Sequence, residues 1–295
     1  METHTESPTL HDAVAVFLLD CEARNFTKST LTYYRFRLGK LVAHFSAPVA
    51  LAAVTATDIR AHLTDLAHHG HGGYSQLGSY RAARAFFNFC IREGWLTKSP
   101  TATMHAPRVE KRQPVIFTPA QVRAILAACN TPRDTAIVYV LLDTGLRRGE
   151  LVALLGRDIN LDTGAVTVRQ GKGQKDRTVF AGAKTRRAVS RYYAQRGRPG
   201  SDDAVWLSIR TGDALTVNGL AQAMKRISRR VGFPVHPHTF RRTFATTSLR
   251  AGMDLETLRI LMGHEDLQTM RRYVLLTGED LRTAQKRFGV VDAMT

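Results

Sequence analysis

Apolar residues recur at helical spacing through most of the chain. Between Leu31 and Phe45 they repeat every three or four positions with basic residues interspersed, which predicts an amphipathic helix. Similar patterns occur around residues 9–21, 57–68 and 74–92, separated by short polar or glycine-rich turns. Together they predict a bundle of about four helices in the first hundred residues.

A second series of elements begins near residue 118. Thr118 supplies a capping hydroxyl, Pro119 suits the first helical position and Gln121 the third, so a helix is predicted to start there. Helical patterns follow at 120–129, 133–144, 183–196, 217–231, 239–250, 255–262 and 278–288. Residues 165–168 and 178–180 alternate instead like strands and predict a β-hairpin. We therefore expect a mainly α fold with a small β-sheet (α+β).

Four prolines and a charged run between residues 100 and 119 separate these two series, which is typical of a linker. The chain has 295 residues, of which 44% are hydrophobic, enough for two packed cores. We predict a helical N-terminal domain at 1–105, a linker at 106–117 and a C-terminal domain at 118–295.

The charge of the chain adds a partner to this picture. There are 42 Lys and Arg against 25 Asp and Glu, a net charge of +17, and residues 109–295 carry most of that excess. The partner must be acidic: nucleic acid, an anionic membrane or an acidic protein. Arginines far outnumber lysines in the sequence, and because a guanidinium binds phosphate oxygens in a bidentate manner, phosphate is favoured.

Several classes of protein are excluded by what the sequence lacks. The longest apolar stretches fall far short of the ~18–20 residues that span a bilayer. The N-terminus does not resemble a secretory signal, so a cytoplasmic location is expected. Phosphate-loop, dinucleotide-binding and His-Glu-x-x-His motifs are missing, which argues against ATP, NAD and zinc-protease chemistry. We expect no cofactor and no metal.

The cysteines and the histidine-rich loop do not change that expectation. Cys21, Cys90 and Cys129 are far apart and form no Cys-x-x-Cys pair, which favours buried thiols over a disulfide or a zinc site. Three histidines lie in the loop at residues 68–73. They have no fixed helical spacing and no Cys or carboxylate partner, so a flexible polar turn is favoured over a metal site.

Two segments of the C-terminal domain place single cations in unusual settings. In residues 144–151, a glycine closes an apolar helix and Arg147 follows, with Glu150 three residues later as a possible salt-bridge partner. A surface arginine after a helix cap is the competing interpretation. In the hairpin loop, Lys172 lies between two glycines and would reach outward from a mobile tip.

Two later segments add histidines, a further arginine and a tyrosine. His238 and Arg241 are three residues apart and would project from one face of a helix, which suits a phosphate. A metal pair made by His236 and His238 would need ligands that the sequence does not offer. Residues 261–273 contain His264 and, nine residues later, Tyr273.

In its motifs, the sequence resembles the tyrosine recombinase (phage integrase) family, with the best match to the Xer-like branch. TGLRRGEL, GKGQKDR, HPHTFRR and LMGH occur in the family's order, and a tyrosine follows at the family's spacing. The resemblance implies catalytic roles for Arg147, Lys172, His238, Arg241, His264 and Tyr273, with Glu150 supporting. It also implies that residues 9–105 form a SAM-like core-binding domain and that both domains clamp around DNA.

The family chemistry implied for this chain is cutting and rejoining of DNA at a recombination site. Tyr273 would be the nucleophile and form a 3′-phosphotyrosine, which needs neither ATP nor metal because the bond energy is retained. Strand exchange would require a homo-tetramer, or a hetero-tetramer with a related recombinase, on double-stranded DNA. The helix predicted at 278–288 would then dock on a neighbouring protomer or on its own domain.

Two other functions remain compatible with the sequence. A type IB topoisomerase uses a similar cationic set and a tyrosine, although the short length and helical first domain argue against it. An architectural DNA-binding protein would need only the charge and the helices. The sequence does not reveal the target site, the accessory factors, the free oligomeric state, or the choice among chromosome dimer resolution, phage integration and transposition.

Overall fold

The chain folds into two compact units in a computed structural model, residues 1–112 and residues 113–295, called here the first and second units. The structure describes residues 8–109, 115–169, 176–264 and 282. The division between the units falls inside the segment 106–117, for which the sequence predicts a linker.

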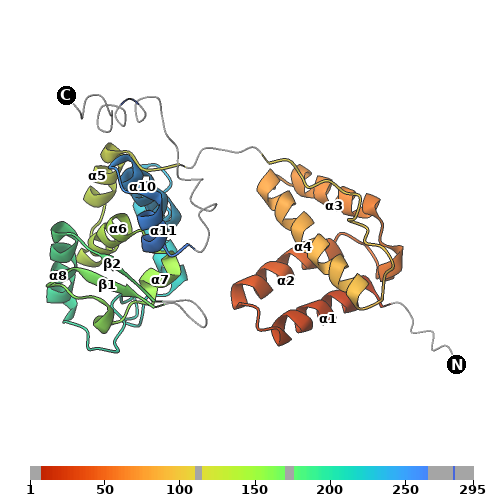
Figure 1. Cartoon of the computed structure of the whole chain (residues 1–295), viewed down its shortest axis with the longest axis horizontal. Helices are drawn as coiled ribbons and strands as arrows, with labels where there is room; N and C mark the ends of the chain where they lie inside the picture. Colours follow the sequence, from red (N-terminus) through yellow and green to blue (C-terminus); the bar gives the residue numbers. More distant parts are fainter. Residues whose placement is uncertain (1–7, 110–114, 170–175, 265–281, 283–295) are drawn as a thin grey trace, which may run out of the picture. The chain divides into compact units, whose positions relative to one another are not determined.

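The first unit is a bundle of the four helices that the apolar spacing predicts (Figure 1). They are α1 (Leu10–Ala23), α2 (Lys28–Val42), α3 (Ala56–His68) and α4 (Gly73–Arg92), with a 3₁₀ turn at Leu51–Ala53 before α3. Threonine side chains cap the first three helices at Thr9, Thr27 and Thr55 by accepting a backbone N–H from the first turn.

An aromatic cluster lies at the centre of this bundle. The Phe17 ring of α1 makes edge contacts with Phe86 and Phe89 of α4, at centroid separations of 5.7 and 5.3 Å. Cys21 and Cys90 are fully buried in the same core, whereas Cys129 of the second unit is half-buried. All three cysteines are free thiols.

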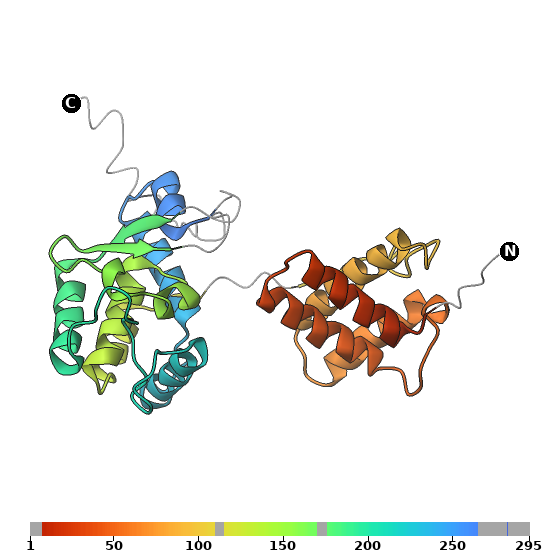
Figure 2. The ribbon, with the colours of Figure 1, turned by 90° about the horizontal axis from the view of Figure 1, so that it is seen from below.

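The second unit surrounds one central helix with other helices and a hairpin (Figure 2). Its helices are α5 (Pro119–Ala127), α6 (Pro132–Thr144), α7 (Arg148–Val152), α8 (Ala183–Arg196), α9 (Val217–Val231), α10 (Pro237–Arg250) and α11 (Leu255–Met262). The buried α6 packs against both α8 and α10, and this packing builds the core of the unit.

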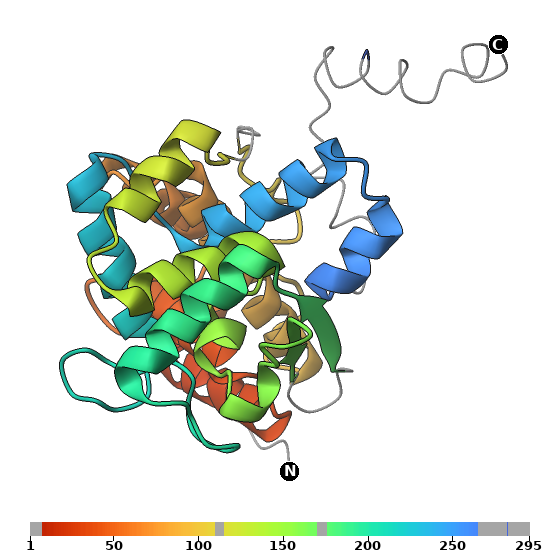
Figure 3. The same ribbon diagram turned by 90° about the vertical axis from the view of Figure 1, so that its left-hand side faces the viewer.

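The two strands pair antiparallel and lie against the end of α11. Strand β1 (Ala165–Val168) is opposite β2 (Arg177–Phe180), with Val168 facing Arg177 in the register. Figure 3 shows the green hairpin beside the blue helix α11, which contacts β2. The mainly α fold with a small sheet is therefore confirmed.

Three local features differ from the sequence prediction or extend it. The short helix α7 and a 3₁₀ turn at Gly156–Asp158 were not predicted, because five and three residues are too few for an apolar period to show. Phe117, placed by the sequence in the linker, is buried in the second unit, and its N–H donates to the hydroxyl of Thr243. None of the helices in the described part of the chain is both long and apolar enough to cross a bilayer.

Candidate active site

Arg147 is held at the junction between α6 and α7, where its sequence motif predicts it. Helix α6 ends at Gly145, whose φ of +62° turns the chain in the left-handed region. Arg147 then occupies the N-cap of α7, and both its N–H and its guanidinium donate to Glu150, at 2.7 Å each. The predicted salt bridge between these residues is therefore present.

Glu150 is shared by two arginines. Arg177, at the start of β2, donates both terminal guanidinium nitrogens to its carboxylate at 3.0 and 2.8 Å. Burial alone would raise the pKa of the Glu150 carboxyl, but hydrogen bonds from Arg177 and then Arg147 outweigh burial and lower the pKa to about 2. Glu150 is therefore an anion throughout the physiological range and orients two guanidiniums at once.

Arg241 lies on α10 and is almost entirely buried, with 2% of its surface exposed. Its guanidinium donates to the main-chain oxygens of Gly145 and Met262, both at 2.6 Å, and lies 3.0 Å from Nε2 of His264. A guanidinium has only donors, so Nε2 of His264 accepts in this contact and the ring proton lies on Nδ1. Arg241 thus joins the ends of α6 and α11 to a histidine of the predicted site.

The C-terminal end of α11 brings together two of the predicted cations, Arg147 and Arg241. Gly263, at φ +60°, ends the helix in a Schellman arrangement, in which the N–H groups of Gly263 and His264 bond back to Ile260 and Arg259. The last two carbonyls of the helix, those of Leu261 and Met262, are left without helical partners, and those of Gly263 and His264 follow directly after it. Each is bound by a different arginine: Leu261 by Arg177, Met262 by Arg241, Gly263 by Arg147 and His264 by Arg259.

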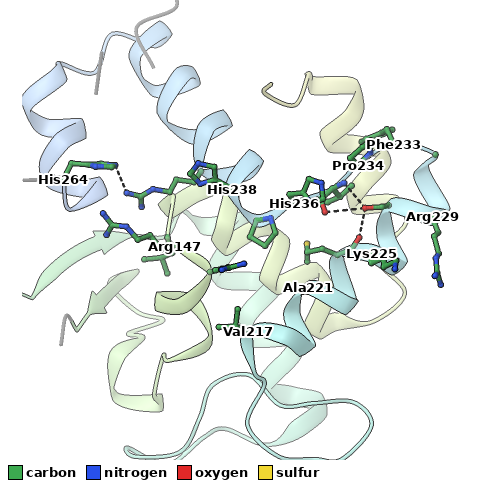
Figure 4. Close-up of a pocket in the computed structure, with 18 residues that line it drawn as sticks. Arg147, Val217, Ala221, Lys225, Arg229, Phe233, Pro234, His236, His238 and His264 are labelled. Atoms are coloured by element: carbon green, nitrogen blue, oxygen red, sulfur yellow. Dashed lines mark hydrogen bonds between the residues drawn. The ribbon is translucent and has the colours of Figure 1, made fainter. Parts of the chain in front are cut away.

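This end of α11 opens onto a cavity of about 1160 Å³. Arg147, His238, Arg241 and His264 all line it, with His238 exposed near the start of α10. Figure 4 shows Arg147, His238 and His264 together at one end of the cavity, and Lys225, Arg229 and Phe233 at the other. Guanidinium and imidazole N–H donors around one opening suit a phosphate group.

Two of the predicted site residues lie outside the described part of the chain. They are Lys172 and Tyr273, and the same holds for the predicted helix 278–288, of which only residue 282 is described. In the described ranges, no group of three or more His, Cys, Asp or Glu residues could hold a metal ion. That finding covers His236 with His238 and the histidines of the 68–73 loop.

Sequence reasoning missed Arg177 as a member of this cluster, although it lies within the GKGQKDR motif. The signal was available in the alternation of β2, because Arg177 and Val179 share one face and both are buried. An arginine on the apolar face of a strand predicts a buried ionic partner. The carbonyl acceptors could not be found in this way, since main-chain groups carry no sequence signature.

Comparison with known proteins shows which family the chain belongs to. The sequence profile of the phage integrase family matches residues 116–279. The tyrosine recombinase XerA of Thermococcus kodakarensis is 32% identical over 248 residues, which cover 80% of this chain and 85% of the relative. The tyrosine recombinase XerC of Oceanobacillus iheyensis is 32% identical over 278 residues, covering 88% of this chain and 90% of the relative.

Solved structures agree in fold. The Tn1549 transposon integrase, in complex with a circular intermediate DNA, aligns with a TM-score of 0.78 at 19% identity, over 95% of this chain and 99% of that one. A λ integrase tetramer bound to a Holliday junction aligns with a TM-score of 0.76 at 20% identity, over 90% and 80%. The chain therefore belongs to the phage integrase family, in which it is a Xer-like tyrosine recombinase.

Proposed function

We propose that this recombinase cuts DNA with Tyr273 and binds the scissile phosphate with Arg147 and Arg241. One observation supports this more than any other. The guanidiniums of these two arginines donate to adjacent carbonyls, those of Gly263 and Met262, and both line one cavity. Two fixed cations at neighbouring positions can meet the two non-bridging oxygens of one phosphodiester.

The proposed cleavage transfers the phosphoryl group at the cleavage site from the DNA 5′ oxygen to the enzyme. The Tyr273 oxygen attacks phosphorus, the bond from phosphorus to the 5′ oxygen breaks, and a 3′-phosphotyrosine forms. Negative charge grows on the non-bridging oxygens as this happens, and preorganised N–H donors stabilise it, typically by about 3–4 kcal/mol for one donor. The DNA 5′-hydroxyl later reverses the attack, which rejoins the strand.

Proton transfer completes the proposed roles. A tyrosine hydroxyl has an ordinary pKa near 10, so it needs cationic neighbours or a base to react at neutral pH. We assign His238 to accept the Tyr273 proton and Lys172 to protonate the leaving 5′ oxygen. His264 donates to the phosphate, and Glu150 supports Arg147 through the contacts described above.

A suicide DNA substrate tests this assignment. A nick placed beside the cleavage site lets a short fragment diffuse away after attack, so the covalent protein–DNA adduct accumulates and survives SDS. Wild type is expected to form the adduct, whereas Tyr273→Phe forms none but still binds DNA. Tyr139→Phe, the same change at a half-buried tyrosine of the second unit, serves as the matched control.

The possible outcomes separate the enzyme classes. An absent adduct in wild type, or an adduct that persists in Tyr273→Phe, would overturn the catalytic assignment. Relaxation of supercoils on any plasmid, without a particular site, would instead indicate a type IB topoisomerase.

We further propose that the chain acts in the cytoplasm on a double-stranded recombination site, with residues 1–105 gripping the DNA. The active assembly is a homo-tetramer, or a hetero-tetramer with a related recombinase, in which the helix predicted at 278–288 docks on a neighbour. Support comes from the fold shared with λ integrase, which is solved as a tetramer on a Holliday junction.

Deleting residues 278–295 tests this docking. The deletion is expected to spare monomer binding to DNA and to remove the tetrameric complex in gel-shift and light-scattering measurements. Loss of both would contradict the docking role.

A further inference from the structure

The structure assigns a role in cleavage to Arg177, a buried side chain that does not line the cavity. We propose that Arg177 is a positioning residue: it fixes Glu150 and the end of α11, and so keeps the guanidiniums of Arg147 and Arg241 in a fixed position relative to each other. This inference rests on the proposed function of those two arginines.

The contacts of Arg177 join three elements. From the first residue of β2, its Nε donates to the carbonyl of Leu261 at 2.7 Å, at the end of α11. Its two terminal nitrogens bind the Glu150 carboxylate of α7 as a fork. Only 8% of Arg177 is exposed, so the side chain cannot reach a DNA phosphate from this place. Each of its three guanidinium nitrogens donates instead to a group that holds the site.

The neighbouring contacts show how Arg177 affects the positions of Arg147 and Arg241. Arg147 is held on one side by Glu150 and on the other by the carbonyl of Gly263. Arg241 is held by the carbonyl of Met262, one residue earlier. Arg177 therefore contacts one support of Arg147, the Glu150 carboxylate, and the Leu261 carbonyl, which precedes the one used by Arg241. A shift of α11 or of Glu150 would move the two guanidiniums relative to each other.

Removing Arg177 would release these supports together. The half-buried carbonyl of Leu261 would lose the Arg177 donor, and the Glu150 carboxylate would keep only Arg147. Because a displacement of about 1 Å can lower a rate on the order of 100-fold, the cleavage step is more sensitive than DNA binding.

The test compares Arg177→Met and Arg177→Lys with Arg186→Met in the full-length protein. Arg186 is a suitable control because it also donates to main-chain carbonyls, those of Leu161 and Asp162, but contacts neither Glu150 nor α11. We expect Arg177→Met to slow single-turnover adduct formation by about 100-fold and to leave DNA affinity within about threefold of wild type. Arg177→Lys, which keeps the charge without the fork, should recover part of the rate and keeps the test valid if the Met variant does not fold.

A double variant tests whether Arg177 acts through Glu150. If it does, the double variant Arg177→Met with Glu150→Gln should form the adduct no more slowly than the slower single variant. Each change already removes the same Arg177–Glu150 interaction. Multiplied losses would overturn the inference. So would a parallel loss of DNA affinity, or an equal loss of cleavage in Arg186→Met at a matched melting temperature.

Amide hydrogen exchange gives a readout that does not require activity. The N–H groups of Gly263 and His264 close the end of α11 and should exchange about tenfold faster in Arg177→Met than in wild type or Arg186→Met. Unchanged exchange there would overturn the inference even if the wild type cleaves DNA. If the wild type forms no adduct but Arg177→Met still exchanges faster at these amides, Arg177 does position the end of α11 and only the proposed function is rejected.

Discussion

At the scale of single residues, the cluster orients its arginines mainly with main-chain carbonyls. Arg241 is bound by two carbonyls, and Arg147 by one carbonyl and the carboxylate that it shares with Arg177. A carbonyl dipole fixes a guanidinium without cancelling its charge, whereas a carboxylate neutralises it. Only Arg147 and Arg177 share the single carboxylate of Glu150, whereas Arg241 is bound by carbonyls, so the three guanidiniums together keep a net positive charge for an incoming phosphate.

The shared carboxylate predicts a pH-dependent stability. The folded chain lowers the pKa of Glu150 from an ordinary 4.5 to about 2. Its stabilising effect is therefore complete above pH 4.5 and declines as the pH falls toward 2. Glu150→Gln should destabilise the second unit by about 3 kcal/mol at pH 7, because it leaves two guanidiniums without their anion.

Urea unfolding of wild type and Glu150→Gln, followed at pH 7 and at pH 3, measures this effect. The difference in unfolding free energy between the two proteins should shrink by about half at pH 3. A difference that stays constant between these pH values would contradict the assigned partners of Glu150.

At the scale of elements, the ends of the helices matter more than their middles. The apolar period predicted ten of the described helices within a few residues, because each buries a continuous stripe. The site, however, is built where α6 and α11 stop and where α7 and α10 start. Glycines at 145 and 263 adopt positive φ there and release carbonyls toward the arginines.

Gly145 provides a test of this arrangement. Its φ is +62°, and a Cβ at this position would collide with the ring of Phe244. Gly145→Ala should therefore cost about 2–3 kcal/mol in the stability of the second unit and displace the carbonyl used by Arg241.

Gly149→Ala is the matched control, since Gly149 lies in α7 with negative φ and open space around its Cα. It should be neutral or stabilise by up to about 1 kcal/mol. Thermal unfolding of both variants checks the pair. Equal melting temperatures for Gly145→Ala and Gly149→Ala would show that Phe244 yields without cost.

At the scale of the whole molecule, two units with separate cores carry unequal charge. The chain has a net charge of +17, and most of the excess lies after residue 108. In α9, four basic side chains occur without any acidic one: Lys225, Arg226, Arg229 and Arg230. A surface of this kind attracts a polyanion over long range and releases its counterions on contact.

Binding to DNA should therefore weaken steeply with salt. If six to ten phosphates are neutralised, affinity falls by about 10³–10⁵ between 50 and 200 mM salt. Fluorescence anisotropy on a labelled duplex measures the slope of log affinity against log salt concentration. A duplex of random sequence and equal length should give a similar slope. A shallow slope on both duplexes would argue against phosphate contacts as the main source of affinity.

The sequence by itself determined the helices, the hairpin and the order of the cationic motifs. Each rests on local information: apolar spacing, capping residues, glycines, and side-chain types at fixed separations. It also offered Glu150, three residues after Arg147, as a salt-bridge partner, and the structure contains that pair.

Only the tertiary structure decided how those motifs meet. Arg177, Arg241 and Arg147 come from distant segments, and the groups that gather them are the carbonyls of Leu261, Met262 and Gly263. Every residue has a carbonyl, so no pattern of side chains could mark these three as acceptors. They became binding groups because the end of α11 leaves the carbonyls of Leu261 and Met262 without helical partners, the cap residue Gly263 adds a third, and the fold brought three arginines to that end.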